Sequence, residues 1–165
     1  MATKGQPRSR VRKLRRMMRL YLDLCCFNRP FDDQSQTRVR LETEAKLALQ
    51  EHVRSGRIEI MWSYILDFEN VQNPFLERAE SIGAWRAMAA DQVSESEAVL
   101  ATARQASALG VKAYDALHVG CAVAGGAAIF VSTDDALLRR LRGFPGLRSA
   151  LPAEALAVVE EWYEE

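Results

Sequence analysis

Short apolar segments alternate with longer segments of helical spacing along most of the chain, and this alternation restricts the fold more than any other feature. Three segments read as buried strands: residues 18–24 (MRLYLDL), 57–65 (RIEIMWSYI) and 127–133 (AAIFVST). Strands that are separated by helices return to one sheet through crossover connections. The alternation therefore predicts an α/β sandwich with a mainly parallel central sheet, and 165 residues suffice for one such domain.

Two of the helices have clear boundary signals. Apolar residues recur at helical spacing from Thr37 to Arg54, and Gly56 follows as a stop signal. Pro152 occupies a first-turn position, where proline is tolerated, and predicts a C-terminal helix. The remaining helices are expected within residues 66–72, 75–89, 94–109, 111–126 and 134–141.

Two local signals refine this picture. Ser94, with Glu97 three residues later, predicts a capping box at the start of the helix that ends near Leu109. Residues 25–35 (CCFNRPFDDQS) are rich in turn-forming residues and are expected to form a loop.

Charge is distributed unevenly although the chain is neutral as a whole. Residues 1–19 hold eight of the 22 basic side chains and no acid, so the other 146 residues carry 14 basic and 22 acidic ones. We expect residues 1–17 to form a basic, disordered tail and residues 18–165 to form the domain. The tail could attract a nucleic-acid backbone; it could equally be a simple leader or reflect the choice of start site.

Several classes of protein are disfavoured. The three cysteines, two of them adjacent, lack metal-ligand spacing, and two histidines form no ligand cluster, so we expect reduced thiols and no zinc site. No apolar run approaches the roughly 20 residues that cross a bilayer. No signal core follows the basic segment. These features favour a cytoplasmic protein.

Four acidic residues from distant parts of the chain are expected at one edge of the sheet. Asp23 ends the first strand, Glu69 lies on the helix after the second, Asp115 lies near the start of a later helix, and Asp134 follows the third strand. Ligands of open α/β sheets bind outside the carboxyl ends of the strands. The four carboxylates could therefore converge at a binding site.

Crowded carboxylates repel one another unless cations neutralise them, and Mg²⁺ or Mn²⁺ prefers oxygen ligands. Such an ion could activate water to attack a phosphodiester. Each acid also has an ordinary interpretation. Asp115 and Asp134 are common helix-capping types, Asp23 could bond a loop, and Glu69 could be a solvated helix residue. The spacing alone leaves both interpretations open.

The residues around these acids resemble the PIN-domain ribonucleases, including VapC-like toxins of toxin–antitoxin pairs. The matching stretches are LYLDLCCFNRPFDD, IMWSYILDFENVQNP, KAYDALHVGCAVAGG and IFVSTDDALLRR. These stretches occur in the order and at the intervals seen in the family, and together they extend from residue 18 to about residue 142. The resemblance implies a three-layer α/β/α sandwich with a PIN-like fold.

The resemblance also implies which residues form the site. The catalytic and metal-binding acids would be Asp23, Glu69, Asp115 and Asp134, and the cofactor Mg²⁺ or Mn²⁺. Asp135 is the alternative to Asp134, since the family often has Thr-Asn-Asp where this chain has Ser-Thr-Asp-Asp. Asp67 lies two residues before Glu69, and a helix places such residues on different faces, so only one can point at the site.

Other residues could support the acids or contact a substrate. The candidates are Asn28, Arg29, Ser132, Thr133 and Asp135. Arg29 could contact a phosphate, Asn28 a base or the turn backbone, and Ser132 or Thr133 a carboxylate or a metal-bound water. Ser132 and Thr133 could equally be ordinary hydroxyl residues at the end of a strand, without any such role. His118, one turn after Asp115, is expected to be a packed or hydrogen-bonded residue rather than a catalytic base.

Aromatic and apolar residues favour packing over nucleic-acid stacking. We expect Trp62, Trp85 and Trp162 to lie in the core or an interface. Phe75, Ile82, Trp85 and Met88 could form an apolar face for a partner, although a core within the chain explains the same pattern. The family resemblance implies a homodimer and, for toxins, a bound antitoxin.

The sequence thus favours a divalent-metal-dependent endoribonuclease that hydrolyses RNA phosphodiester bonds, as the toxin of a type II toxin–antitoxin pair. A housekeeping RNA-processing nuclease is one alternative. A PIN-like binding or regulatory module with weak catalysis is another, although the presence of four acids argues against it. Fold analogy alone does not decide between them.

Overall fold

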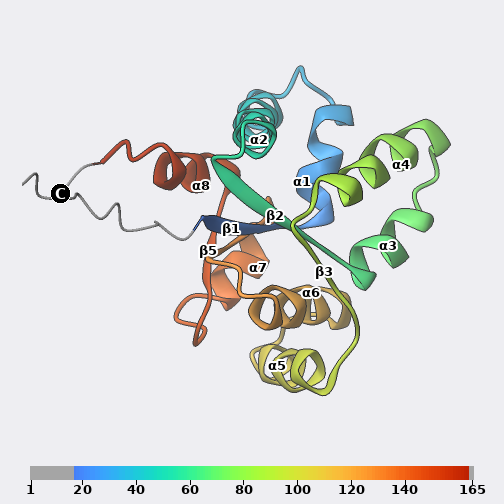
Figure 1. Cartoon of the computed structure of the whole chain (residues 1–165), viewed down its shortest axis with the longest axis vertical. Coiled ribbons are helices and arrows are strands. Elements are labelled where there is room, and N and C mark those ends of the chain that lie inside the picture. The colour runs from blue at the N-terminus through green and yellow to red at the C-terminus, as the bar shows by residue number, and fades with distance from the viewer. Residues whose placement is uncertain (1–16, 164–165) are drawn as a thin grey trace, which may run out of the picture.

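The computed structural model describes residues 17–163 and places five parallel strands in the order β3-β2-β1-β4-β5 (Figure 1). The strands are β1 (Met18–Leu22), β2 (Ile58–Ser63), β3 (Asp91–Val93), β4 (Ile129–Val131) and β5 (Arg148–Ala150). Leu20 pairs with Ile60 of β2 on one side, and Leu22 pairs with Val131 of β4 on the other. The central strand is therefore the first in the chain.

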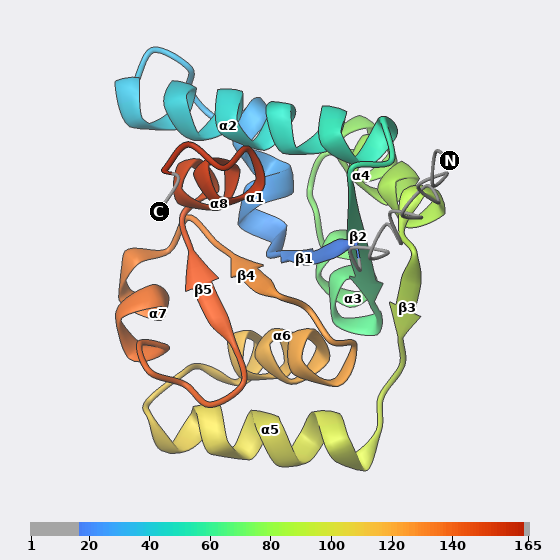
Figure 2. The ribbon, with the colours of Figure 1, turned by 60° about the vertical axis from the view of Figure 1, so that its left-hand side comes forward.

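Helices cover both faces of this sheet. They are α1 (Leu24–Asn28), α2 (Thr37–Arg54), α3 (Tyr64–Val71), α4 (Leu76–Gly83), α5 (Glu97–Ala108), α6 (Ala113–Ala124), α7 (Asp135–Arg140) and α8 (Pro152–Val159), with 3₁₀ turns η1 (Arg29–Phe31) and η2 (Ala84–Met88). Helices α1, α2 and α8 lie on one side, and α6 with α5 outside it lies on the other (Figure 2). The predicted three-layer sandwich is confirmed.

Burial on both faces explains the composition of the central strand. Leu20, Tyr21 and Leu22 follow one another in β1, and all three are buried. Successive strand residues point to opposite faces, so a run without polar residues is what a doubly covered parallel sheet requires. The two aromatic rings of Tyr21 and Phe130 stack between β1 and β4 at 5.7 Å between centroids.

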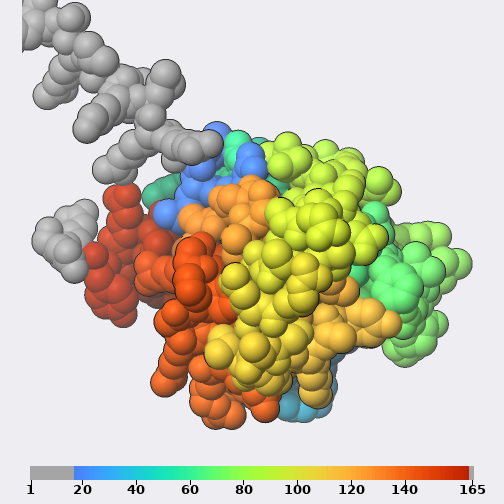
Figure 3. Space-filling model, turned by 90° about the horizontal axis from the view of Figure 1, so that it is seen from below, coloured from blue at the N-terminus to red at the C-terminus, as the bar shows by residue number. Residues whose placement is uncertain are grey.

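Helices α5 and α6 approach each other closely, and α5 forms the face of the molecule seen from below (Figure 3). Gly120 of α6 lies against the backbone of Val99 in α5, where any Cβ would collide with the Val99 carbonyl oxygen. Gly120 therefore permits the close approach of α5 and α6.

Several predicted boundaries are confirmed and others are wrong. Helix α2 spans the predicted residues, and α8 begins at Pro152. The helix predicted from Ser94 instead begins at Glu97 and is capped by Ser96, whose hydroxyl accepts from Val99 N at 3.2 Å. Ser94 cannot cap it because it directly follows β3.

The predicted loop at residues 25–35 and the number of strands also need correction. Residues 25–31 of that segment are helical, as parts of α1 and η1, and the Asp23 side chain caps α1. Strands β3 and β5 were not predicted; each has three residues and forms by pairing with a neighbouring strand. The predicted tail lies almost wholly outside the described residues. No helix within residues 17–163 is long and apolar enough to span a bilayer.

Candidate active site

Asp23 is fixed at the carboxyl end of the central strand. Its backbone N–H donates to Val131 O of β4 at 2.9 Å, and its Oδ1 accepts from Leu24 N at 2.7 Å. The Ser132 hydroxyl donates to Asp23 Oδ2 at 3.1 Å. Asp23 is buried, and these bonds stabilise its carboxylate where burial would otherwise be costly. Ser132 thus takes the carboxylate-binding role that the sequence raised as one possibility.

Glu69, on α3, is linked to the same site by a contact with the buried side chain of His118. His118 Nε2 lies 2.8 Å from Glu69 Oε1 and 3.9 Å from Asp23 Oδ1. Its other ring nitrogen, Nδ1, lies 2.6 Å from the Tyr21 hydroxyl, which lies 2.7 Å from Ser63 Oγ. Because an ionised carboxylate only accepts hydrogen bonds, Nε2 carries the proton that faces Glu69. The chain Ser63–Tyr21–His118 therefore orients the Glu69 carboxylate.

The charge of this environment acts on His118. Burial lowers the pKa of His118, but the hydrogen bond to Glu69 and the charges of Asp23, Glu69 and Asp115 outweigh it, so the net pKa is raised. The sequence placed His118 correctly as a hydrogen-bonded helix residue, but its partners were not predictable from spacing.

Asp115 lies in the first turn of α6 and faces the other acids. Its pKa is raised to about 6, mainly by burial, then by the charge of Asp23, with smaller contributions from Asp134 and Glu69; nearby His118 opposes the shift. No hydrogen bond within residues 17–163 stabilises this carboxylate. The charges of the other three carboxylates therefore act on Asp115, and the ionised form of Asp115 is disfavoured in the folded protein.

Asp134 and Asp135 point to different partners. Asp134 caps α7, with its Oδ1 accepting from Ala136 N at 3.0 Å and Leu137 N at 3.1 Å. Asp135 forms a two-bond ion pair with Arg38 of α2, at 2.6 and 2.9 Å. The geometry therefore favours Asp134 as the fourth acid, since it acts on Asp115 while Asp135 is engaged elsewhere.

Asp67 is directed away from this cluster. Its Oδ1 accepts from the Trp62 indole N–H at 2.7 Å, and its Oδ2 lies 3.7 Å from Arg86 Nη1. This arrangement agrees with the expectation that only one of the two acids on α3 faces the site. Trp62 is buried in the core, as expected, whereas Trp162 is more than half exposed.

A cleft of about 390 Å³ opens beside the acids. Its walls include Glu69 and Asp115, with Lys112, Tyr114 and Gln72. The rings of Tyr114 and Phe68 lie 5.6 Å apart, and both side chains are about half exposed. Sequence reasoning missed Lys112 and Tyr114 as site residues; their position next to Asp115 at the start of α6 was the available signal.

The other predicted site residues have partners within the chain. Arg29 pairs with Asp32 at 3.1 Å and Glu42 at 3.3 Å, which commits its guanidinium to the structure around η1. Asn28 Oδ1 accepts from Asn73 Nδ2 at 3.5 Å. The backbone N–H of Thr133 contacts Cys25 Sγ at 3.4 Å, and Cys25 also lies 3.5 Å from Asp23 Oδ2.

The acids meet the chemical requirement for a hard cation, although the side chains of Asp23, Glu69 and Asp134 are bonded to local partners. As they lie, no three His, Cys, Asp or Glu side chains in the described part of the chain are close enough to hold a metal ion. Glu69 faces His118, and Asp134 faces the backbone of its own helix. Uncompensated carboxylates repel one another, so an arrangement in which the acids lean toward donors is the expected one without added charge.

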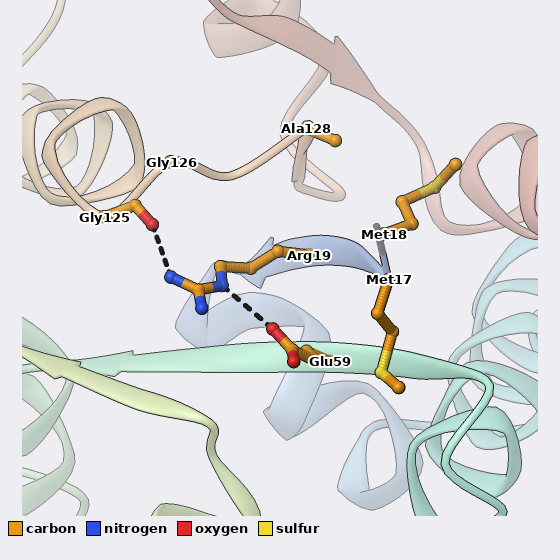
Figure 4. A pocket seen from close by; sticks show the side chains of 7 residues that line it. All are labelled: Met17, Met18, Arg19, Glu59, Gly125, Gly126 and Ala128. Carbon is orange, nitrogen blue, oxygen red and sulfur yellow. Dashed lines mark hydrogen bonds and ion pairs between the residues drawn. The ribbon is translucent and has the colours of Figure 1, made fainter. Parts of the chain in front are cut away.

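Another cavity lies at the opposite end of the sheet. It has a volume of about 450 Å³ and is lined by residues such as Met18, Arg19 and Glu59 near the amino ends of β1 and β2 (Figure 4). Arg19 donates to Glu59 Oε2 at 3.1 Å and to Gly125 O at 2.8 Å, so its guanidinium is already satisfied. None of the four acids lines this cavity, and we do not assign the site to it.

Comparison with known proteins identifies the fold. No family model matches the sequence, and no curated protein is significantly similar to it. Among solved structures, a chain of the DNA-bound VapBC complex from Salmonella typhimurium is similar, with a TM-score of 0.52 and 18% identity over 82% of this chain and 99% of that one. A chain of VapBC2 from Rickettsia felis bound to a promoter DNA fragment is also similar, with a TM-score of 0.52 and 13% identity over 81% of this chain and 98% of that one.

Proposed function

We propose that this chain, which has a VapC-like PIN-domain fold, is a divalent-metal-dependent endoribonuclease and the toxin of a toxin–antitoxin pair. The observation that carries the proposal is that acids from separate elements lie near one another at the carboxyl edge of β1. His118 Nε2 lies 2.8 Å from Glu69 Oε1 and 3.9 Å from Asp23 Oδ1, and Asp115 lines one cleft with Glu69. The charges of Asp23, Asp134 and Glu69 also contribute, after burial, to the raised pKa of Asp115.

The donor set fits Mg²⁺ or Mn²⁺ and not a softer metal. It consists of carboxylate oxygens, and the one nearby thiol, Cys25, already contacts Asp23 and Ser132. Asp23, Glu69, Asp115 and Asp134 would hold the ion. When bound, the cation would stabilise charge on the phosphate and make a water acidic enough to attack near neutral pH.

The protein's own residues would then hold and orient the reactants. Ser132 and Leu24 N fix Asp23, and His118 fixes Glu69. Asp115, in the first turn of α6, lies beside them in the same cleft as Glu69 and could accept a hydrogen bond from a nearby water. Lys112 could attract a phosphate at the cleft, and the exposed ring of Tyr114 offers a surface for a base.

Partners follow from the same likeness. The similar solved structures are VapBC complexes, which supports an antitoxin as partner of this chain. We also propose a homodimer. Of the predicted apolar face, Ile82 is buried in this chain, while Phe75 and Met88 remain exposed and available to a partner. A housekeeping nuclease or a silent module would instead show no growth arrest on expression.

The proposal is tested by titrating Mn²⁺ into the wild type and an Asp23→Asn/Asp115→Asn double variant by calorimetry, with RNA cleavage followed on the same samples. We expect binding and cleavage in the wild type and neither in the double variant. Growth arrest on expression should also disappear with Asp23→Asn. Absence of Mn²⁺ binding by correctly folded wild type would refute the metal nuclease.

A pair of single variants tests the choice of the fourth acid. Asp134→Asn keeps an oxygen that can cap α7 and removes only the charge. We expect it to reduce cleavage by at least about tenfold, because a charged ligand is lost. Asp135→Asn breaks the ion pair with Arg38 and should leave cleavage within about twofold, since an exposed pair contributes little to stability. The opposite ranking in steady-state assays would make Asp135 the fourth acid.

His118→Leu tests whether the buried chain of hydrogen bonds orients Glu69. The change keeps an apolar body of similar volume and removes the Nε2 donor. We expect the Mn²⁺ affinity to fall by about ten- to a hundredfold, as for other residues that orient a ligand. Tyr21→Phe is the matched control, since it keeps the Nε2 donor and should cost less affinity. Equal affinities of His118→Leu and wild type would show that His118 only fills space.

A further inference from the structure

Three exposed arginines at the end of α7 and the start of β5 have no acidic partner. They are Arg140, the last residue of α7, Arg142, two residues beyond it, and Arg148, the first residue of β5. None of them forms an ion pair within residues 17–163. Arg19 and Arg86, by contrast, pair with carboxylates. A guanidinium group without a carboxylate is free to bind another anion.

The first of these arginines lies close to the cleft of the candidate active site. Lys112 lines that cleft together with Glu69 and Asp115. Gly110 lies two residues before Lys112, and an added Cβ at Gly110 would lie 3.4 Å from Arg140 Nε. Arg140 therefore lies at the turn between α5 and α6, beside the wall of the cleft that Lys112 forms.

The other two arginines lie farther along the edge of the sheet. Arg142 and Arg148 line one cavity of about 310 Å³ beside α7 and β5. Glu154 also lines this cavity, but its Oε1 accepts from Leu151 N at 3.3 Å. No ion pair joins Glu154 to either arginine in the part of the chain that the structure describes. The two arginines therefore give this cavity an uncompensated positive charge.

The charge of this segment is opposite to that of the body. Residues 136–153 hold four arginines and no acid, whereas the 146 residues from 20 to 165 hold 22 acidic and 14 basic side chains. The fourth arginine, Arg139, lies one turn after Asp135 and acts on that acid. Clustered cations attract a polyanion, and arginine suits phosphate because it can donate two parallel hydrogen bonds. Phosphate groups are therefore the ligands that this segment fits.

The spacing of the arginines favours a chain of phosphates over a single anion. Strand β5 is two strands away from β1, or about 10 Å, since neighbouring strands lie about 4.8 Å apart. Arg148 lies at the amino end of β5, whereas the cleft lies at the carboxyl end of β1. One phosphate does not span from Lys112 to Arg148, whereas several successive nucleotides do.

We infer that Arg140, Arg142 and Arg148 form a track for the sugar–phosphate backbone of RNA, which leaves the cleft past Lys112 and runs along α7 toward β5. The choice of RNA rests on the nuclease proposed above, but binding along the track needs no cleavage. Contacts to phosphates position a nucleic acid and read no bases. The track therefore favours RNA that extends several nucleotides beyond the cut site over shorter RNA of any sequence.

Fluorescence anisotropy in EDTA measures the binding of RNA to the full-length protein without metal-dependent cleavage. The probe is a labelled single strand of about 20 nucleotides, and KCl is varied because counterion release makes such binding depend on salt. The test variant is Arg140→Gln/Arg142→Gln/Arg148→Gln. Each phosphate contact contributes about 0.7 to the slope of log K against log [KCl] for a single strand, so we expect the slope to be smaller by about 2. Lysine at the same three positions keeps the charge and should restore the slope.

A control variant separates the track from a general loss of positive charge. Arg40→Gln/Arg54→Gln/Arg86→Gln also removes three exposed arginines, from α2 and η2. Its slope should stay within about 0.5 of the wild-type value. Substitutions of exposed residues change stability little, so both triple variants should melt close to wild type. If the test variant does not fold, Arg142→Gln and Arg148→Gln alone should each lower the slope by about 0.7.

Equal slopes for the test and control variants would overturn the inference, and tighter binding to DNA of the same sequence than to RNA would overturn the choice of RNA. Cleavage with Mn²⁺ separates the track from the nuclease. We expect the ratio of kcat/KM for the long RNA to that for a tetranucleotide to fall at least about tenfold in the test variant alone. If wild type cuts RNA but the two variants share one ratio, the track fails and the nuclease stands. If wild type cuts no RNA, the nuclease proposal fails, and the slopes in EDTA still decide the track.

Discussion

Replacing Asp115 with asparagine is expected to reduce metal-dependent RNA cleavage by at least about a hundredfold. The same change is expected to stabilise the metal-free protein. Activity falls because a charged metal ligand is lost. Stability rises because the carboxylate is disfavoured in the folded state: its pKa is raised to about 6 by burial and by the other acids. No hydrogen bond to Asp115 within residues 17–163 is broken by the change.

The pH dependence of this stabilisation has a definite sign. An acid whose folded pKa lies above its unfolded value of 3.8 destabilises the fold fully above about pH 6 and not at all below about pH 4. After a discount for its partial exposure, the gain at pH 7.5 is about 1–2 kcal/mol, or roughly 2–8 °C in Tm. At pH 4 the variant and wild type should melt together.

Added metal should reverse the order of stability. In EDTA the Asp115→Asn variant should melt at the higher temperature, and with excess Mn²⁺ the wild type should, because a ligand that binds only the folded state stabilises it. Differential scanning fluorimetry in the two conditions measures this crossover. If the variant is less stable than wild type in EDTA at pH 7.5, the acids do not repel one another as described.

Gly120→Ala is expected to destabilise the protein by about 2–3 kcal/mol and to lower Tm by roughly 4–12 °C. Its new Cβ would collide with the carbonyl oxygen of Val99 and crowd the Val99 side chain at 3.1 Å. A backbone atom cannot rotate away, so α5 and α6 must separate. Alanine is favoured over glycine in a helix by only about 1 kcal/mol, which is too little to compensate.

Gly83→Ala is the matched control for this prediction. Gly83 is also helical, but its Cβ would meet only Asn70 Nδ2, at an ordinary 3.5 Å. Chemical denaturation should show Gly83→Ala to be neutral or slightly stabilising and Gly120→Ala to be clearly destabilised. Similar midpoints for the two variants would mean that α5 is free to move outward at little cost.

Local signals predicted the long helices and central strands well. The amphipathic repeat and Gly56 delimited α2, and Pro152 marked the start of α8. Strands β3 and β5 have three residues each and little alternation, so their pairing with β2 and β4 decides their structure rather than their own sequence. Ser94 matches the capping pattern better than Ser96 does, but the backbone after β3 places the cap and the helix start two residues later.

In the candidate site, too, local sequence predicted the positions of the residues but not the contacts between them. The positions of Asp23 and Asp134 followed from strand ends, that of Glu69 from the helix after the second strand, and that of Asp115 from the start of a later helix. The contacts that orient them join residues far apart in the sequence: His118 meets Tyr21 and Glu69, and Ser132 meets Asp23. Such pairs depend on how strands and helices pack, which no single stretch of sequence encodes.

The position of β1 at the centre of the sheet bears on when the fold, and with it the proposed nuclease site, can be completed during synthesis. The first strand leaves the ribosome early, but one of its two neighbours, β4, spans residues 129–131. Until that segment emerges, one edge of β1 has no partner strand and Asp134 is not yet made. A ribosome adds about 5–20 residues per second, so the nascent chain remains without its last acid for several seconds. If the chain is the nuclease proposed above, that interval lets a partner engage the growing protein before its site is complete.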